Sequence, residues 1–125
     1  MGPTMAQFRL IVTDVDASVA FYGTHLGFAL VDQFGPAMAI MHRDDLTLWL
    51  AGPLASASKP MPDGVRPGPG GWNRFVLLVD DLAATVLRLR SAGVGFRNEI
   101  LAGPGGQQIL IADPSGNLVE LFEPA

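Results

Sequence analysis

Apolar residues along this chain follow two periods, one typical of β-strands and one typical of α-helices. An apolar run rich in β-branched residues precedes each of two aspartates, Asp14 and Asp81. After each aspartate, apolar residues recur at the spacing of one helix face. The pattern therefore predicts one helix over about 15–26 and a second over about 82–92.

Start and stop signals flank both predicted helices. Asp14 and Asp81 are N-cap candidates, because a short carboxylate accepts hydrogen bonds from the free amides of a first helical turn. Gly27 and Gly93 follow the last helical residues, where the chain commonly adopts a left-handed conformation that glycine tolerates. These signals agree with the apolar spacing about where each helix begins and ends.

Short strands are predicted after each helix. In the stretch Asp113-Pro-Ser-Gly-Asn, Pro114 fixes φ and Gly116 permits a positive φ, so we expect a turn there. Each half of the chain then reads β-α-β-β-β. The predicted strands after the helices cover about 28–34, 37–43 and 46–51 in the first half, and about 94–101, 107–112 and 118–122 in the second.

The two halves are copies of one pattern, and such repeats decide how a fold is interpreted. The stretch between them is rich in Pro, Gly and Ser, which is typical of a linker. We expect a single domain over 1–125, with module one at 6–51, a linker at 52–71 and module two at 72–124. Neither half is large enough to be stable alone, so the modules share a core within one chain or pair with a second chain. The matched residues are Phe8 with Phe75, Leu10 with Leu77, Val12 with Val79, Asp14 with Asp81 and Val19 with Val86.

Composition narrows the classes of function. With 49% apolar and 16% charged residues, the chain has enough apolar side chains to bury a core. A net charge of −4 and only eight basic residues argue against nucleic acid, since phosphate contacts need clustered Lys and Arg. No apolar run is long enough for a bilayer, and the chain start lacks the pattern of a signal peptide. Because there is no cysteine, thiolate chemistry and disulfides are excluded, and we expect a cytoplasmic protein.

Two local motifs add to the repeat. The first is the helix segment Asp14-Val-Asp-Ala-Ser-Val-Ala-Phe-Tyr-Gly-Thr-His-Leu-Gly-Phe28, and the second is the turn and strand Asp113-Pro-Ser-Gly-Asn-Leu-Val-Glu-Leu121. Together with the paired modules, over residues 6–124, they resemble the vicinal oxygen chelate superfamily, which includes glyoxalase I, bleomycin-resistance proteins and extradiol dioxygenases. The resemblance implies an α+β, glyoxalase-like fold of two βαβββ modules, with curved mixed sheets around a cleft. It also implies a homodimer.

The resemblance further implies four positions for metal ligands, on the first and last strand of each module, where metal-dependent members use His, Glu or Gln. Glu120 and Gln7 are usable ligands. Leu48 has no donor atom, and the permanent charge of Arg74 would repel a cation, so we expect no metal cofactor. In chain order the positions fall on Gln7, Leu48, Arg74 and Glu120, and a slip of one in the strand alignment would move the second to Thr47 or Trp49.

Arg74 and Glu120 occupy two positions whose side chains would meet on one metal. We therefore predict that they form an ion pair in its place, since an Arg fork fits a carboxylate. Under one interpretation the pair only satisfies a buried carboxylate. Under the other, Arg74 is held by Glu120 and offers its spare N–H groups to an anionic or carbonyl oxygen of a ligand.

Period-two alternation along the strands predicts which other side chains face the cleft. Trp49 and Trp72 border the linker, where they would stack on a planar ligand or simply pack in a core or a dimer contact. The sequence leaves open which of Gln107 and Gln108 faces the cleft, and the same ambiguity applies to Arg97 and Asn98. The candidate ligand-binding residues are Gln7, Arg9, Trp49, Trp72, Arg74, Glu120 and Phe122.

Three hypotheses for function follow. The first is a metal-independent protein that binds a small, partly apolar molecule in a cleft. The second is an enzyme of the superfamily, a lyase, isomerase or dioxygenase, which in a metal-free version would use Glu120 as base and Arg74 to stabilise an oxyanion. The third is a subunit whose role is assembly with another protein. The expected partner is a small molecule, with no nucleic acid and no membrane.

Overall fold

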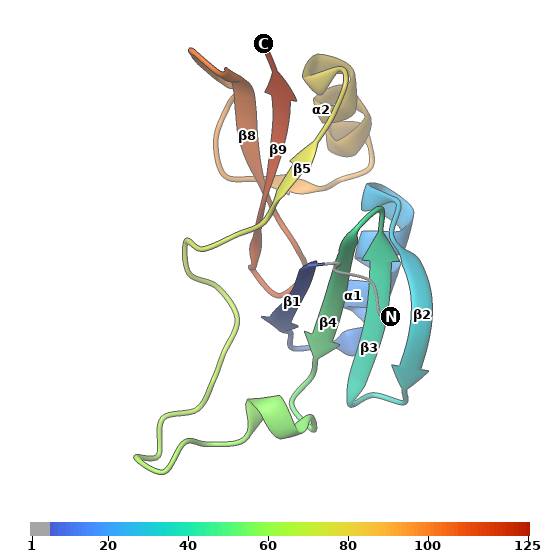
Figure 1. Ribbon diagram of the computed structural model, residues 1–125, viewed down its shortest axis with the longest axis vertical. Helices are drawn as coiled ribbons and strands as arrows, with labels where there is room; N and C mark the ends of the chain where they lie inside the picture. The colour runs from blue at the N-terminus through green and yellow to red at the C-terminus, as the bar shows by residue number, and fades with distance from the viewer. Residues whose placement is uncertain (1–5) are drawn as a thin grey trace. The chain divides into compact units, whose positions relative to one another are not determined.

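The structure is a computed structural model and describes residues 6–125. The chain start, where no signal peptide is expected, lies outside the described residues. The chain divides into two compact units, one that ends at Pro69 and one that begins at Gly70. Each unit holds one α-helix and one sheet, and each is described by itself (Figure 1). The assignment of the whole chain to one domain with two modules stays a prediction.

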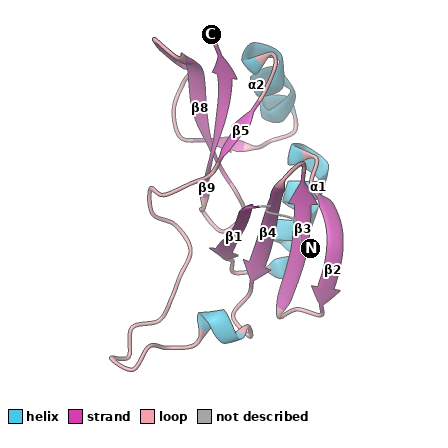
Figure 2. Ribbon diagram, in the orientation of Figure 1, coloured by secondary structure: helices cyan, strands magenta, loops and turns pink. Residues whose placement is uncertain are grey.

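The first unit contains a four-stranded mixed sheet with strand order β1-β4-β3-β2 (Figure 2). Strand β1 runs parallel to β4, and the remaining neighbours are antiparallel. A short 3₁₀ helix, Ser56–Ser58, follows the sheet. The other elements are β1 (Ala6–Ile11), α1 (Val15–Leu26), β2 (Ala29–Phe34), β3 (Met38–Arg43) and β4 (Leu46–Ala51).

The second unit contains a five-stranded mixed sheet with order β5-β9-β8-β6, in which β7 also pairs with β8. Strand β5 runs parallel to β9. Neither sheet closes into a barrel, and the predicted α+β class is confirmed. The elements are β5 (Val76–Leu78), α2 (Leu82–Ser91), β6 (Gly95–Phe96), β7 (Leu101–Gly103), β8 (Gly106–Ala112) and β9 (Leu118–Pro124).

Both predicted helix caps are present. The side chain of Asp14 accepts a hydrogen bond from the Ala17 amide at 3.0 Å, and that of Asp81 accepts one from the Ala84 amide at 3.0 Å. Each carboxylate therefore satisfies an amide that has no partner inside the helix. The glycines past the two helices have positive φ angles, 72° at Gly27 and 82° at Gly93.

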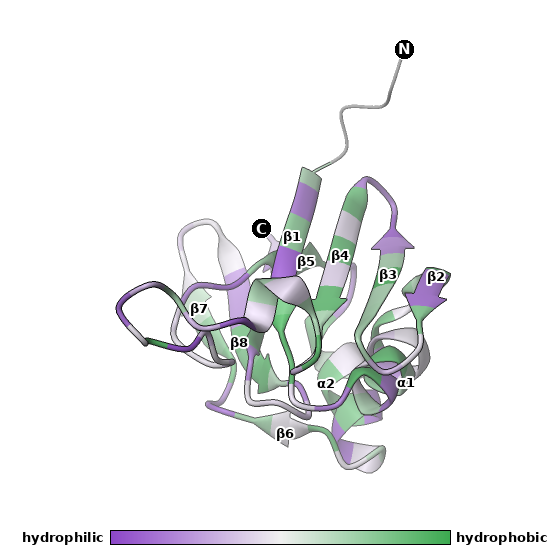
Figure 3. Cartoon of the chain, turned by 90° about the horizontal axis from the view of Figure 1, so that it is seen from below, coloured by the Kyte–Doolittle hydropathy of each residue, from purple (hydrophilic) through white to green (hydrophobic). Residues whose placement is uncertain are grey.

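Each helix covers one face of its own sheet, and the strand side chains alternate between that face and the opposite one. Figure 3 shows this alternation of hydrophobic and hydrophilic residues along β1. In the second unit, α2 buries Leu82, Val86 and Leu89 and contacts β9. We call the sheet face opposite each helix its open face. The sheet residues buried beneath α2 are Ile109, Ile111, Val119 and Leu121.

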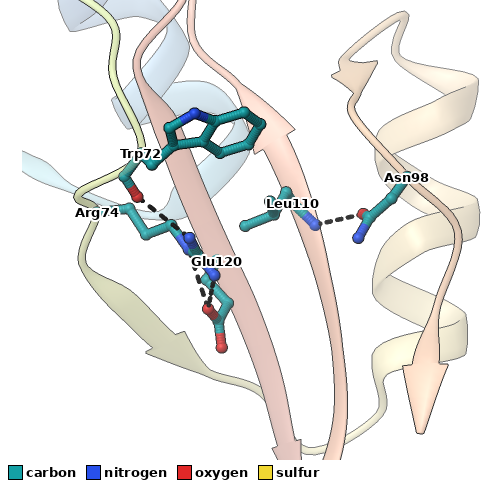
Figure 4. Close-up of polar contacts among 5 residues, drawn as sticks. All are labelled: Trp72, Arg74, Asn98, Leu110 and Glu120. Carbon is teal, nitrogen blue, oxygen red and sulfur yellow. Dashed lines mark hydrogen bonds and ion pairs between the residues drawn. The ribbon is translucent and has the colours of Figure 1, made fainter.

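The single strand predicted over 94–101 is wrong. The backbone leaves the sheet after β6 and returns only at β7. The Arg97 amide still donates to the Leu110 carbonyl at 2.9 Å, but the Leu110 amide donates to the side-chain oxygen of Asn98 at 2.9 Å (Figure 4). Asn98 therefore replaces a backbone acceptor, which lets the chain depart without leaving the Leu110 amide unpaired.

Candidate functional site

On the open face of the first sheet, three predicted site residues come together. The indole N–H of Trp49 donates to Gln7 Oε1 at 2.5 Å. The guanidinium of Arg9 lies over the same indole, 4.9 Å from the ring centroid, which is the geometry of a cation–π contact. We call the hydrogen-bonded residues the Gln7–Trp49 pair.

The register of this sheet corrects the second of the four metal-ligand positions. In β1–β4, Arg9 lies opposite Trp49, just as Val76 lies opposite Glu120 in β5–β9. Trp49 is therefore the counterpart of Glu120. Leu48 is wrong for this position, because it points to the other face, where it is fully buried on the side of α1.

In the second unit, Arg74 and Glu120 form the predicted ion pair. Arg74 Nη2 and Nε donate to the same oxygen, Glu120 Oε1, at 2.8 and 3.0 Å. Arg74 Nη1 donates to the Trp72 carbonyl at 3.1 Å (Figure 4). The Glu120 side chain is 10% exposed and that of Arg74 is 28% exposed. A carboxylate with so little access to water needs such charged donors, because burial of an unpaired charge is costly.

The pair leaves hydrogen-bonding capacity unused on both partners. A guanidinium has five N–H groups, and three of those of Arg74 are engaged, so two remain. Glu120 Oε2 has no hydrogen bond within residues 6–125 and is not sealed from solvent. Arg74 itself lies two residues before β5 rather than on the strand, since β5 begins at Val76.

The open face of the second sheet is mostly apolar around this pair. Strand register resolves the two ambiguities left by the sequence. Gln108 lies opposite Phe122 on the open face, whereas Gln107 lies opposite Glu123 on the helix side. Arg97, whose amide bonds Leu110, also belongs to the open face. Other side chains of this face include Val76, Leu78, Leu110, Ala112, Leu118 and Phe122.

A known protein family matches the chain over almost all of its length. The family model described as Glyoxalase/Bleomycin resistance protein/Dioxygenase superfamily matches residues 4–121. The chain belongs to this superfamily. No curated protein sequence matches it significantly. The match covers both repeats.

Solved structures of the superfamily have similar folds over nearly the whole chain. Lactoylglutathione lyase from Agrobacterium tumefaciens is 25% identical, with a TM-score of 0.76 and coverage of 98% of this chain and 96% of that one. TnmS3, an antibiotic binding protein from a Streptomyces species, is 27% identical, with a TM-score of 0.74 and coverage of 100% and 99%. The fosfomycin resistance protein FosX from Listeria monocytogenes is 16% identical, with a TM-score of 0.74 and coverage of 100% and 96%, and supports the fold alone.

The superfamily's metal does not fit the side chains that this member places at the ligand positions. Trp49 has no acceptor atom for a cation, and Arg74 carries a positive charge against the one oxygen of Glu120 that it engages. The Gln7 oxygen already accepts from the Trp49 indole. Within residues 6–125, no group of three or more His, Cys, Asp or Glu side chains is arranged to hold a metal ion. In the same residues, no helix is long and apolar enough to cross a membrane.

Proposed function

We propose that this protein binds a small, partly apolar organic molecule on the open face of the second sheet, without a metal ion. The observation that carries the proposal is the hydrogen bonding of the Arg74 guanidinium. It is fixed by Glu120 and by the Trp72 carbonyl, yet it keeps two N–H groups for another partner. A rigid cationic donor costs little further conformational entropy when a ligand oxygen accepts from it.

Apolar side chains beside the pair supply the second part of the binding surface. Val76 is 47% exposed and Leu78 is 63% exposed, and both lie on the same face as Glu120. Small-molecule sites typically combine an apolar wall with a few fixed polar groups. A ligand that covers Val76 and Leu78 while a carbonyl or anionic oxygen accepts from Arg74 would satisfy both. The superfamily relative TnmS3, an antibiotic binding protein, supports binding of this kind.

The first sheet, taken by itself, offers a similar surface, and we propose that this surface can also bind a small molecule. Arg9 and Trp49 stack on its open face, and the indole N–H of Trp49 is already bonded to Gln7. A half-buried indole with one polar edge satisfied presents mainly its apolar ring. Planar molecules are therefore the ligands that this surface would favour.

The test is a titration of ¹⁵N-labelled protein with a panel of aromatic amides, ketones and acids, followed by the backbone amide signals of Val76, Gln108 and Leu110. We expect saturable shifts with at least one compound, and loss of most of the affinity in the double variant R74Q/E120Q, which removes both charges and shortens only the side chain at position 74.

The matched control is R90Q/E99Q. It removes an exposed ion pair of the same unit, Arg90 with Glu99 at 3.0 Å, away from the open face. Binding that survives in R74Q/E120Q as well as in the control would show that the Arg74–Glu120 pair is only structural. No saturable shift with any compound would contradict the proposal itself.

A metal-free enzyme is the second candidate, and the observation that favours it is Glu120 Oε2. This oxygen is unbonded within residues 6–125 and is not fully buried, so it could accept a proton from a substrate held by Arg74. Turnover of a carbonyl compound that is abolished in Glu120→Gln, while binding of that compound persists, would favour the enzyme. Binding without turnover across the panel would favour the binding protein.

Two further predictions belong with the proposal. We propose that the protein is a homodimer and that it acts in the cytoplasm. Light scattering on the purified chain measures the first directly, and a mass of one chain would contradict it.

A further inference from the structure

A pocket lies at one end of the open face of the second sheet, and we call it the Trp72 pocket. It has a volume of about 280 Å³. Its floor is apolar, because Ala112 and Leu118 face each other across β8 and β9. The charged member of its lining is Arg97. The lining residues are Gly71, Trp72, Arg97, Ala112, Gly116 and Leu118.

Arg97 is an arginine without a polar partner. Its guanidinium lies over the Trp72 indole, 5.0 Å from the ring centroid. It makes no side-chain hydrogen bond or ion pair within residues 6–125, whereas Arg74 and Arg90 each hold a carboxylate. Stacking on an indole leaves the edge of a guanidinium free, so its five N–H groups stay available to a ligand.

Hydrogen bonds hold the backbone of both residues in this stack, Arg97 and Trp72. The Arg97 amide donates to the Leu110 carbonyl at 2.9 Å, and the next residue, Asn98, accepts from the Leu110 amide. The Trp72 carbonyl accepts from Arg74 Nη1, so the ion pair also fixes the segment that carries the indole. The stack therefore has a fixed orientation before a ligand binds.

Neither of the two carboxylates near the pocket, Glu120 and Asp113, is bonded to Arg97. The carboxylate of Glu120 is engaged by Arg74. Asp113, in the turn beside Gly116, accepts hydrogen bonds from the amides of Ser115 and Asn117 at 2.9 Å. Arg97 thus faces the pocket without a carboxylate to neutralise it, and a planar fork of N–H donors matches the oxygens of a carboxylate.

We propose that the Trp72 pocket binds the carboxylate of a planar aromatic acid, with Arg97 as the carboxylate receptor and the indole as the surface for the ring. Trp72 is 63% exposed, so the indole has room for a ring beside the guanidinium. The proposal rests on the proposed function and narrows it, because it names an acid as the class of ligand. Arg97 is then the residue that distinguishes an acid from its neutral isostere.

The experiment compares 2-naphthoate with 2-naphthamide, which has the same ring and no charge, on the ¹⁵N-labelled full chain. The reporters are the Trp72 indole N–H and the Arg97 Nε–H. We expect 2-naphthoate to bind about tenfold more tightly than 2-naphthamide, as a charge-assisted fork implies. In Arg97→Gln that preference disappears, and in the control Arg88→Gln, on the helix covering the other face, it persists.

Equal affinity for the acid and the amide in wild-type protein overturns the proposal, and so does an acid preference that survives in Arg97→Gln. Absence of any shift at the two reporters up to about 10 mM acid, the range of very weak binding, also overturns it. The amide signals of Val76 and Gln108 report separately on the proposed function. Shifts there with neutral compounds, without an acid preference at Arg97, leave the proposed function standing and remove only this inference.

Discussion

The two modules use equivalent positions of one repeat for different chemistry. On the first sheet, Gln7 and Trp49 share a neutral hydrogen bond, and on the second sheet Arg74 and Glu120 share an ion pair. Trp49 and Glu120 occupy equivalent positions by strand register. Trp49 lies opposite Arg9, and Glu120 lies opposite Val76, which is the counterpart of Arg9 in the repeat. In each module, the two positions that the resemblance implied for metal ligands are joined directly.

The difference between the pairs follows from burial. Gln7 is exposed and Trp49 is half-buried, so water can replace either partner of their bond. Glu120 is nearly buried, so its negative charge needs the positive charge of Arg74 as a partner. An exposed neutral bond contributes little to stability, whereas breaking a buried ion pair leaves an uncompensated charge. We therefore expect the free energy of unfolding to fall more when the pair of module two is broken than when the pair of module one is broken. The pair of module two also holds the N–H donors suited to a ligand.

The largest effect is expected for Arg74→Met. It leaves the Glu120 carboxylate without its charged donors, and we expect the free energy of unfolding to fall by about 2–3 kcal/mol, the lower end for buried pairs because Arg74 is partly exposed. The double variant R74M/E120M removes the stranded charge and recovers most of that loss. Urea unfolding of the four proteins of this double-mutant cycle measures both. Equal stability of R74M and wild type would show that water solvates Glu120 well.

The helix caps are expected to give an intermediate and equal effect in the two modules. Asp14 and Asp81 accept the same hydrogen bond at the same distance, 3.0 Å. Asp14→Ala and Asp81→Ala should each lower the free energy of unfolding by about 1 kcal/mol. The same urea experiment compares them, with Asp45→Ala in an exposed turn as the control. A large difference between the two caps would show that the repeat does not extend to the energetics of its helices.

The smallest effect is expected for Gln7→Met, which removes the acceptor of the Trp49 indole N–H. Because water reaches this surface, the loss should be about 0.5 kcal/mol or less. The indole signal of Trp49 should nevertheless shift, which an NMR spectrum of the variant detects. A loss as large as that of R74M would contradict the contrast between the modules.

The sequence was sufficient for the features that depend on local chemistry. Asp14 and Asp81 cap the helices as predicted, because capping needs only a carboxylate next to its own helix. The Arg74–Glu120 ion pair was predicted from the superfamily spacing and is present. The role of these residues in ligand binding stays a prediction.

Features that depend on strand register were not predictable in the same way. Leu48 was placed at the second position because the apolar runs of the two last strands align in more than one way, and only pairing with β1 shows that Trp49 faces the open side. Arg97 was ambiguous because its strand breaks at Asn98, whose side chain replaces a backbone acceptor. A break of that kind has no periodic signal, so alternation could not assign the face of Arg97.

Direct side-chain pairs stand at the positions that the resemblance to metal-dependent members implied for ligands. The most direct test is titration of tag-free, ¹⁵N-labelled protein with Mn²⁺ and Ni²⁺, whose unpaired electrons broaden the signals of nearby nuclei. We expect equimolar metal to leave the amide signals of Val76 and Glu120 and the Trp49 indole signal at full intensity. Selective broadening of these signals at equimolar metal would show that an ion displaces Arg74 or Trp49, and would contradict the account.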